Sequence, residues 1–347
     1  CASARNRRTP PPSLPPSTAP DAAKNRKKLW GAMLAAVEMI EGGTTTFADM
    51  YGPYMEKVAE ATADAGLRAV LSRGIIGVAP DGDAKIEENV ALYKDFHGAA
   101  DGRITVMFGP HAPYTCPPDF LKKVAKTAQS LGAEVHIHMA ETKAEIEQIT
   151  KAYGKRPFRY VEETGLFDGK GTLAAHCVHL DEEDIAIIKK HGIRVAHNPG
   201  SNMKLASGVA PVPRLLKEGV CVALGTDGAS SNNNLDMLEE INLAAMLHKV
   251  STLDPLAVPA RTALKMGTEY GAKAVGLTGV GKLEAGCKAD ITLFDMDGAA
   301  WYPRNDLASL LVYSAHADSA STVLVDGKVL MEDKELLTLD KERIFYE

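Results

Sequence analysis

The sequence lacks several features that define large classes of proteins. No segment approaches the ~18 consecutive apolar residues of a membrane-spanning helix, so a membrane protein is not expected. Basic residues do not exceed acidic ones, and the formal net charge of -6 argues against a nucleic-acid polymer as a partner. The 5 cysteines include no CxxC pair, which favours reduced thiols over a disulfide framework. Together these absences predict a cytoplasmic globular protein.

The first 26 residues lack the apolar periodicity of the remaining chain. Residues 1–20 read CASARNRRTPPPSLPPSTAP, rich in Pro, Ser, Ala and Arg, and contain no apolar core of a secretory signal. Such a segment cannot bury enough apolar surface to offset the entropy lost on ordering. We therefore expect residues 1–26 to be disordered and foreign to the fold. The missing initiator Met leads us to expect either a fragment or a mistranslated start.

From residue 27 onward, short β-branched runs alternate with amphipathic helical stretches, as in the βα units of a parallel sheet. Polar or charged residues follow strand after strand. An open doubly wound sheet would not explain this clustering, whereas a parallel barrel places its active site at these strand ends. We therefore expect an α/β fold, a (β/α)8 TIM-type barrel over residues 27–280 with one of its eight strands missing. The expected strands are Thr44–Phe47, Arg68–Ser72, Ile104–Phe108, Val135–His138, Thr172–Ala175, Arg194–His197 and Val220–Leu224.

Beyond residue 280, short strands follow one another without long helices. Ile291–Phe294 and Thr322–Val325 have strand character, and Asp326-Gly327 is a two-residue hairpin signal before Lys328–Leu330. Residues 281–347 are therefore expected to form a partial, small β-sandwich appendage and the C-terminal tail. Histidines outside the strand ends are expected at the surface: His97, His191, His248 and His316.

Candidate catalytic residues begin with the segment Val135–Glu141, which reads VHIHMAE. His136 and His138 fall on the same face of the expected strand, and Glu141 follows three residues later. An imidazole that holds a metal ion and a carboxylate that moves protons are what metal-assisted hydrolysis requires. HxHxxE is only moderately specific by itself, because a single buried histidine is more often a core residue.

Two further strands end on groups of the same kind. His176 follows the strand at 172–175, and Asp227 follows the apolar strand at 220–224. A carboxylate at this place can bind a metal and accept a proton from metal-bound water, although an Asp beside Gly is more often a turn residue. Each motif is weak alone, and their fixed order along successive strand ends is the stronger signal.

The strings HIHMAET, AHCVHL, HNPGSNMKL and LGTDGASSNN occur in this order between residues 136 and 233. Together they resemble the amidohydrolase superfamily, specifically its 5-methylthioadenosine/S-adenosylhomocysteine deaminases and their triazine-hydrolase relatives, over roughly residues 29–340. The resemblance implies a metallo-dependent hydrolase that deaminates a purine nucleoside such as 5-methylthioadenosine or S-adenosylhomocysteine and releases ammonia. The alternatives are a guanine, cytosine or triazine aminohydrolase of the same superfamily, or an inactive fragment.

The resemblance also implies catalytic and metal-binding roles. His138 and Asp227 would bind one divalent metal, for which zinc suits the ligands and iron and manganese are alternatives. Glu141 would protonate the ring nitrogen next to the reacting carbon and help ammonia depart. His176 would polarise the attacking water and stabilise the developing oxyanion, while Asp227 would accept a proton.

Substrate contacts are implied by the same resemblance. His111, Glu141 and Asp227 would contact the nucleoside, and Arg73 matches an arginine that binds the carboxylate of S-adenosylhomocysteine. A second basic contact would fall near Lys85, whose ammonium cannot form the planar fork that pairs with a carboxylate. The expected partner is thus a small nucleoside, without nucleic acid or membrane, and a homo-oligomer is left open.

One part of the family pattern is missing. The family carries a metal-binding HxH pair on its first barrel strand, whereas the HxH pair of this sequence is His136/His138, which the trailing Glu141 assigns to the fifth strand. The N-terminal half of the β appendage has no counterpart either. We therefore expect two protein ligands instead of four, and an open barrel edge between the eighth and second strands.

Overall fold

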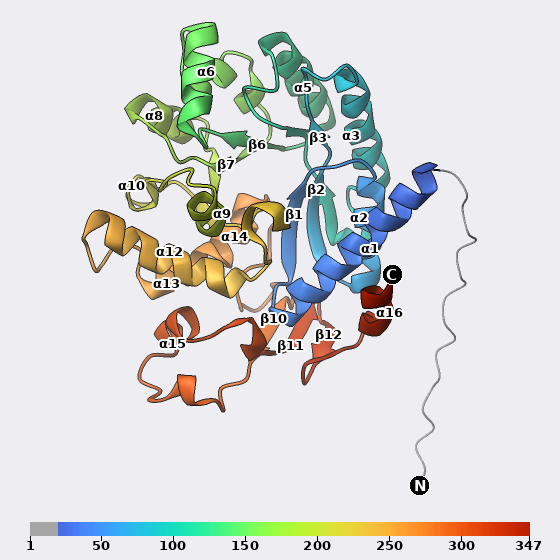
Figure 1. Cartoon of the computed structure of the whole chain (residues 1–347), viewed down its shortest axis with the longest axis vertical. Coiled ribbons are helices and arrows are strands. Elements are labelled where there is room, and N and C mark those ends of the chain that lie inside the picture. The colour runs from blue at the N-terminus through green and yellow to red at the C-terminus, as the bar shows by residue number, and fades with distance from the viewer. Residues whose placement is uncertain (1–19) are drawn as a thin grey trace.

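The computed structural model describes residues 20–347, with side chains from residue 23 onward. Within them, seven parallel strands follow the spatial order β1-β2-β4-β6-β7-β8-β9, and an isolated bridge between Phe108 and Val135 joins β4 to β6 (Figure 1). Helices connect successive strands, as parallel pairing requires. The strands are Thr46–Met50 (β1), Arg68–Ser72 (β2), Ile104–Val106 (β4), Val135–Met139 (β6), Thr172–His176 (β7), Arg194–His197 (β8) and Val222–Leu224 (β9), with short extensions at Gly74–Ile75 (β3) and Gly109–Pro110 (β5).

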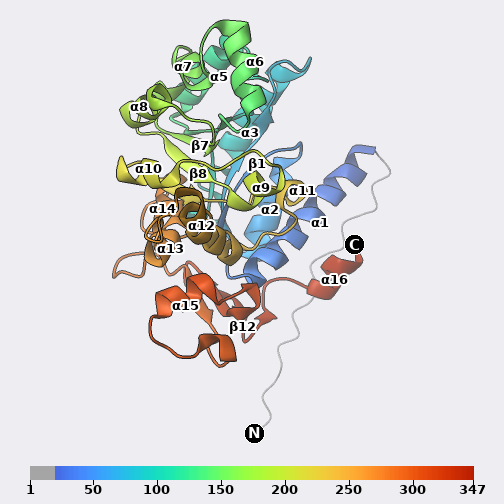
Figure 2. The ribbon, with the colours of Figure 1, turned by 60° about the vertical axis from the view of Figure 1, so that its left-hand side comes forward.

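Helices surround the sheet (Figures 1 and 2). Local sequence signals set their ends: Pro118 opens α5, Gly132 in the left-handed region ends it, and Asp181 and Asp184 form a capping box on α8. No helix within residues 20–347 combines the length and apolar character needed to cross a bilayer. The main helices are Pro20–Glu41 (α1), Met55–Ala65 (α2), Gly82–Phe96 (α3), Pro118–Leu131 (α5), Lys143–Tyr153 (α6), Pro157–Glu162 (α7), Glu182–Lys190 (α8), Val212–Lys217 (α10), Met237–Thr252 (α12), Ala260–Met266 (α13) and Glu269–Ala274 (α14).

The order of strands agrees with the expectation from sequence, but some boundaries differ. The strand expected at 44–47 lies at Thr46–Met50, so that Asp49 belongs to it. Helix α1 begins at Pro20, within the segment expected to be disordered, because Ala and Lys residues there favour a helix and Pro suits its first turn. Residues 1–19 of that segment lie outside the described residues.

The edge strand β1 is less buried than β2 and β7 inside the parallel sheet, whereas the other edge strand, β9, is buried. Every residue of β2 and β7 is buried, as expected for strands covered on both faces. In β1, only Met50 is fully buried and Ala48 is exposed. No strand of residues 20–347 is hydrogen-bonded to the outer edge of either β1 or β9.

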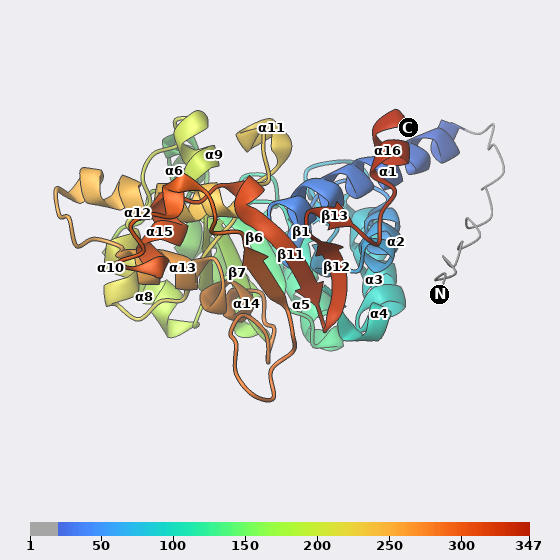
Figure 3. The same ribbon diagram turned by 90° about the horizontal axis from the view of Figure 1, so that it is seen from below.

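The C-terminal region forms a small antiparallel sheet, which lies below the barrel in Figure 1 and in front of it in Figure 3. Asp326 and Gly327 both have positive φ and form the expected two-residue turn between β11 and β12. The described residues supply one sheet here and not the second layer of a sandwich. Its strands are Ile291–Phe294 (β10), Ala320–Val325 (β11), Lys328–Glu332 (β12) and Glu335–Leu336 (β13).

Candidate functional site

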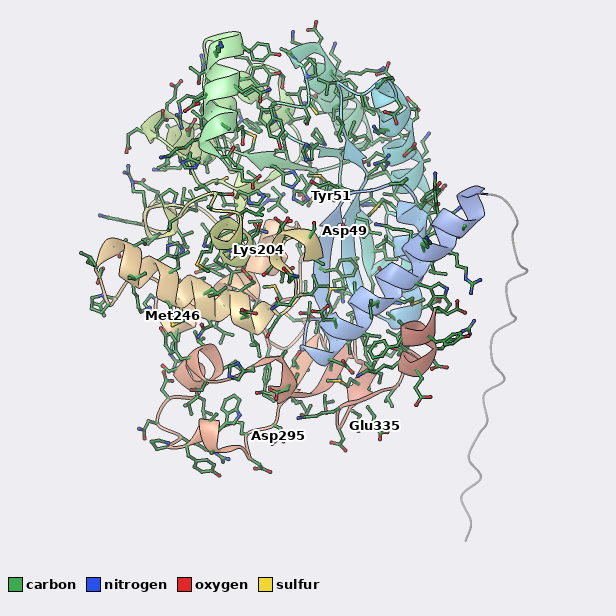
Figure 4. All side chains as sticks on the ribbon, in the orientation of Figure 1. Asp49, Tyr51, Lys204, Met246, Asp295 and Glu335 are labelled. Atoms are coloured by element: carbon green, nitrogen blue, oxygen red, sulfur yellow. The ribbon has the colours of Figure 1, made fainter. Side chains whose placement is uncertain are left out.

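A cavity of about 880 Å³ lies between α1, β1 and β9 and extends from the strand ends toward the appendage. Asp49 and Tyr51, labelled in Figure 4, lie at the carboxyl end of β1. The C-terminal ends of parallel strands are where active sites of this architecture form. The lining includes the chemically competent side chains Asp49, Tyr51, His136, His138, His176 and Asp227.

The backbone is in the left-handed region at three of these strand ends. The φ angles are +52° at Ala140, +72° at His176 and +64° at Asp227. Residues other than glycine adopt this conformation at a cost, and such residues concentrate at functional sites. The backbone therefore turns sharply just after β6, at the end of β7 and after β9, beside or at the candidate residues.

Hydrogen bonds to backbone and amide oxygens fix the tautomers of two histidines. Nδ1 of His138 lies 2.7 Å from the carbonyl oxygen of His111, and Nδ1 of His176 lies 2.9 Å from Oδ1 of Asn202. Because both oxygens can only accept, both Nδ1 atoms carry a proton, and in the neutral form of each ring the lone pair is on Nε2. The rings stack with centroids 5.5 Å apart. Burial, reinforced by neighbouring histidines, lowers the pKa of His138 well below its usual value.

Glu141 lies beside His176. Its Oε2 is 3.8 Å from Nε2 of His176, too far for a hydrogen bond, and its Oε1 accepts a hydrogen bond from Ser207. The turn that carries Glu141 is held by Glu145, whose carboxylate accepts hydrogen bonds from the N–H groups of Ala140 and Glu141 at 2.8 and 2.9 Å. Burial raises the pKa of Glu145 to about 7.

Both carboxylate oxygens of Asp227 are engaged. Ser201 donates a hydrogen bond to Oδ2 at 2.7 Å, and the N–H of Gly228 donates to Oδ1 at 2.6 Å. These donors orient the carboxylate toward the cavity while leaving lone pairs free on both oxygens.

The expected nucleoside contact His111 is tied to the cavity through Tyr51. Thr115 donates to the carbonyl of Ala112, so its hydroxyl accepts from Nδ1 of His111, and Nε2 accepts from the Tyr51 hydroxyl at 3.1 Å. The His111 ring lies 5.0 Å from that of His138, centroid to centroid. Burial lowers the pKa of His111, so the ring is neutral at pH 7.

Arg73 and Lys85 do not line the cavity. Arg73 is buried, pairs through Nε with Glu88, and donates from Nη1 to the carbonyl of Gly74. Lys85 pairs at 2.6 Å with Asp81, the N-cap residue of its own helix α3. Both cations therefore have carboxylate partners within the chain.

Several residues around the site were not singled out from the sequence. Ser201, Asn202 and Ser207 act as hydrogen-bond partners, and the string HNPGSNMKL was the one available signal for the first two. The expectation that His248 lies at the surface was wrong. This histidine is fully buried with its Nε2 3.1 Å from Nε2 of His197, because α12 packs over the end of β8.

The described donors fit a divalent metal in kind but not in number. Lone pairs on Nε2 of His138 and His176 and on the Asp227 carboxylate suit zinc. Nevertheless, no three His, Cys, Asp or Glu side chains within residues 20–347 are close enough together to hold an ion. A tetrahedral site therefore needs more donors than these residues provide.

Comparisons with known proteins agree with the motifs. The amidohydrolase family model matches residues 24–330. A 5-methylthioadenosine/S-adenosylhomocysteine deaminase from Pelotomaculum thermopropionicum is 55% identical over 318 residues, which cover 92% of this chain and 73% of the relative. The corresponding protein of Syntrophomonas wolfei is 52% identical over 316 residues, which cover 91% and 73%.

Solved structures share the fold. A zinc-bound adenosine deaminase from Xanthomonas campestris superposes with a TM-score of 0.88 at 32% identity, covering 93% of this chain and 74% of that one. A zinc complex of atrazine chlorohydrolase from Arthrobacter aurescens gives 0.86 at 26% identity, with coverage of 93% and 76%. The fold is thus the TIM barrel of the metallo-dependent hydrolases. The chain belongs to the amidohydrolase family and, within it, to the group of 5-methylthioadenosine/S-adenosylhomocysteine deaminases.

Proposed function

We propose that the protein hydrolyses the exocyclic C–N bond of a purine nucleoside such as 5-methylthioadenosine or S-adenosylhomocysteine. Water adds to the ring carbon that bears the amino group, the C–N bond breaks, and ammonia leaves behind a carbonyl. The observation that carries this proposal is the convergence of His138, Glu141, His176 and Asp227 at one end of the barrel, in a chain 55% identical to a deaminase of this name.

The fixed tautomers indicate what each group does. Nε2 of His176 carries a lone pair, so it accepts a hydrogen bond from the attacking water and orients it. It can stabilise an oxyanion only after it has gained a proton. Glu141, a short distance away, holds the proton that goes to the ring nitrogen, and Asp227 takes a proton from the water. Such proton transfers contribute about 10²–10⁴-fold each.

We propose that His138 and Asp227 contribute to a divalent metal site, with zinc as the ion. A bound ion of this kind would lower the pKa of water to about 7. The zinc-bound adenosine deaminase and chlorohydrolase structures support the type of ion. Since the described donors do not complete a site, we derive no catalytic step through the metal.

We further propose that the described barrel is one strand short between β1 and β9. The seven parallel strands, the partly exposed β1 and the cavity lined by both edges support this proposal. In this family the missing strand would carry the HxH metal ligands, so zinc should bind this chain weakly.

Arg73 bears on the choice between the two nucleosides. We propose that the carboxylate of S-adenosylhomocysteine would have to displace Glu88 from Arg73. 5-Methylthioadenosine has no carboxylate and leaves this ion pair intact, which favours it as the substrate.

Ammonia release from a panel of 5-methylthioadenosine, S-adenosylhomocysteine, guanine, cytosine and a triazine tests the function. With zinc added, we expect release from the first two compounds and a loss of roughly 10²-fold or more in Glu141→Gln. Release from the other three compounds alone would shift the assignment within the family. A folded protein that binds no zinc at micromolar concentration and releases no ammonia would be the inactive fragment.

A further inference from the structure

Two loops at the carboxyl ends of the strands hold the partners of His176 and Asp227. The first follows β8 and contains the short helix Pro199–Lys204 (α9), and the second follows β9 and contains Ala229–Asn232 (α11). We propose that Glu240 of α12 is a positioning residue that ties these two loops together and thereby sets the geometry of the site. The proposal deepens the deaminase function and rests on it for its catalytic consequence.

The carboxylate of Glu240 makes one hydrogen bond to each loop. Its Oε2 accepts from the N–H of Gly200 at 3.0 Å, and its Oε1 accepts from Nδ2 of Asn232 at 2.8 Å. The same amide of Asn232 also donates to the carbonyl of Thr226 at 2.9 Å. The carboxylate is fully buried, so both bonds are shielded from competing water.

Each of these anchor points is next to a residue that holds the site. Gly200 directly precedes Ser201, which donates to Asp227, and Asn202, which fixes the tautomer of His176. On the other loop, Thr226 directly precedes Asp227. One carboxylate therefore fixes both Asp227 and the groups that orient Asp227 and His176.

Gly200 lies close against the carboxylate of Glu240. A Cβ built on Gly200 would lie 2.3 Å from Oε1 of Glu240, so a side chain at this position would displace the carboxylate. The loop backbone thus lies directly on the carboxylate, and a side chain at this position would separate them.

Burial of the Glu240 carboxylate costs desolvation free energy. No salt bridge joins Glu240 to a cation among residues 20–347, and burial raises its pKa to about 7. An apolar residue at this position would avoid the desolvation penalty. The two hydrogen bonds to the loops therefore best explain why a carboxylate occupies this buried position.

Hydrogen–deuterium exchange of the full chain tests the proposal without requiring activity. A glutamine at position 240 has one oxygen and one NH₂ group. The oxygen can accept from either Gly200 N–H or Asn232 Nδ2, and the NH₂ group faces the remaining donor, so one of the two loops loses its hydrogen bond. We expect amides of at least one of the two loops, residues 198–208 or 225–234, to exchange roughly tenfold faster or more, while those of β7 stay unchanged. The matched control is Glu239→Gln, the exposed neighbour on the same helix, whose amide oxygen can still accept the hydrogen bond from Asn234, so both loops should exchange as in the unmodified protein.

A second variant covers the case in which Glu240→Gln does not fold. Asn232→Ala breaks the tie to the second loop alone, so residues 225–234 should lose protection while residues 198–208 keep it. Equal loosening of the loops and of β7 in Glu240→Gln, or unchanged loops in both variants, would overturn the proposal.

The catalytic consequence has a separate readout. If the chain releases ammonia, Glu240→Gln should lower kcat by on the order of 10²-fold and change KM little, because it misplaces groups without removing a substrate contact. Failure of the deaminase assignment would remove this readout but leave the exchange result intact. Unchanged kcat would overturn the positioning role even where the loops loosen.

Discussion

The buried ion pair between Arg68 and Asp290 joins the barrel to the C-terminal sheet, and breaking it should be costly. Arg68 on β2 donates from Nε and Nη2 to the two oxygens of Asp290 at 2.8 and 2.9 Å. The side chains are only 1% and 3% exposed. Asp290 also accepts a hydrogen bond from the N–H of Asp326 in the turn between β11 and β12.

Asp290→Asn keeps the shape of the side chain and the acceptor for Asp326 but leaves the guanidinium without a counter-ion. Removing one partner of a buried pair costs about 3–5 kcal/mol, because the remaining charge stays buried. This is a large part of the roughly 5–15 kcal/mol by which a domain is stable. Urea unfolding monitored by circular dichroism should therefore show a clear fall in the midpoint.

Two companion variants make the reasoning refutable. Asp326→Asn removes the more exposed pair with Lys288 and should cost less than about 1 kcal/mol, since Asn tolerates the left-handed turn at this position. Arg68→Met combined with Asp290→Asn removes the unpaired charge and should recover most of the loss. The explanation would be refuted if Asp290→Asn lowered the free energy of unfolding as little as Asp326→Asn does. It would also be refuted if the double variant lowered it by the sum of the two single losses.

Two further predictions concern histidines. Burial lowers the pKa of His248 to about 4 from its ordinary value of 6.5, so the unfolded chain binds this proton first as the pH falls. The contribution of His248 to the free energy of unfolding should be constant above pH 6.5. Between pH 6.5 and pH 4, protonation of the unfolded chain should lower the free energy of unfolding by about 3 kcal/mol. Urea titrations of His248→Asn should show a correspondingly smaller acid-induced loss, and an identical pH dependence would contradict the assignment. In Asn202→Leu, the acceptor for Nδ1 of His176 is lost, so ¹⁵N spectra of the imidazole should change from one tautomer to a mixture. Retention of the Nδ1–H form alone would show that another group fixes it.

The strand ends that carry the site could be predicted because their signals are local. An apolar run that ends at His176, or that is followed within three residues by Asp227, predicts both the strand and the end of the barrel at which the polar group lies. The family motifs then supplied the order of strands that short runs alone leave open, and the comparisons confirmed the family.

The partners of these residues could not be predicted because they depend on contacts between distant segments. Asn202 reaches His176 from 26 positions away, and Glu240 reaches Gly200 from 40 positions away. His248 follows Ala244 by four positions and therefore lies on the buried face of α12, but its polar side chain suggested the surface; its partner His197 is 51 positions away. Arg73 could be matched to a substrate contact by motif, but its pairing with Glu88 follows only from how α3 lies beside β3.

The left-handed backbone at His176 and Asp227 affects how substitutions at these positions are to be interpreted. Alanine at either position removes the functional group and also disfavours the local turn, so a loss of activity would combine two causes. Asparagine adopts positive φ more readily than other non-glycine residues. Asp227→Asn and His176→Asn therefore separate chemistry from conformation, and a mutational scan of this barrel should rank other residues at both positions against asparagine.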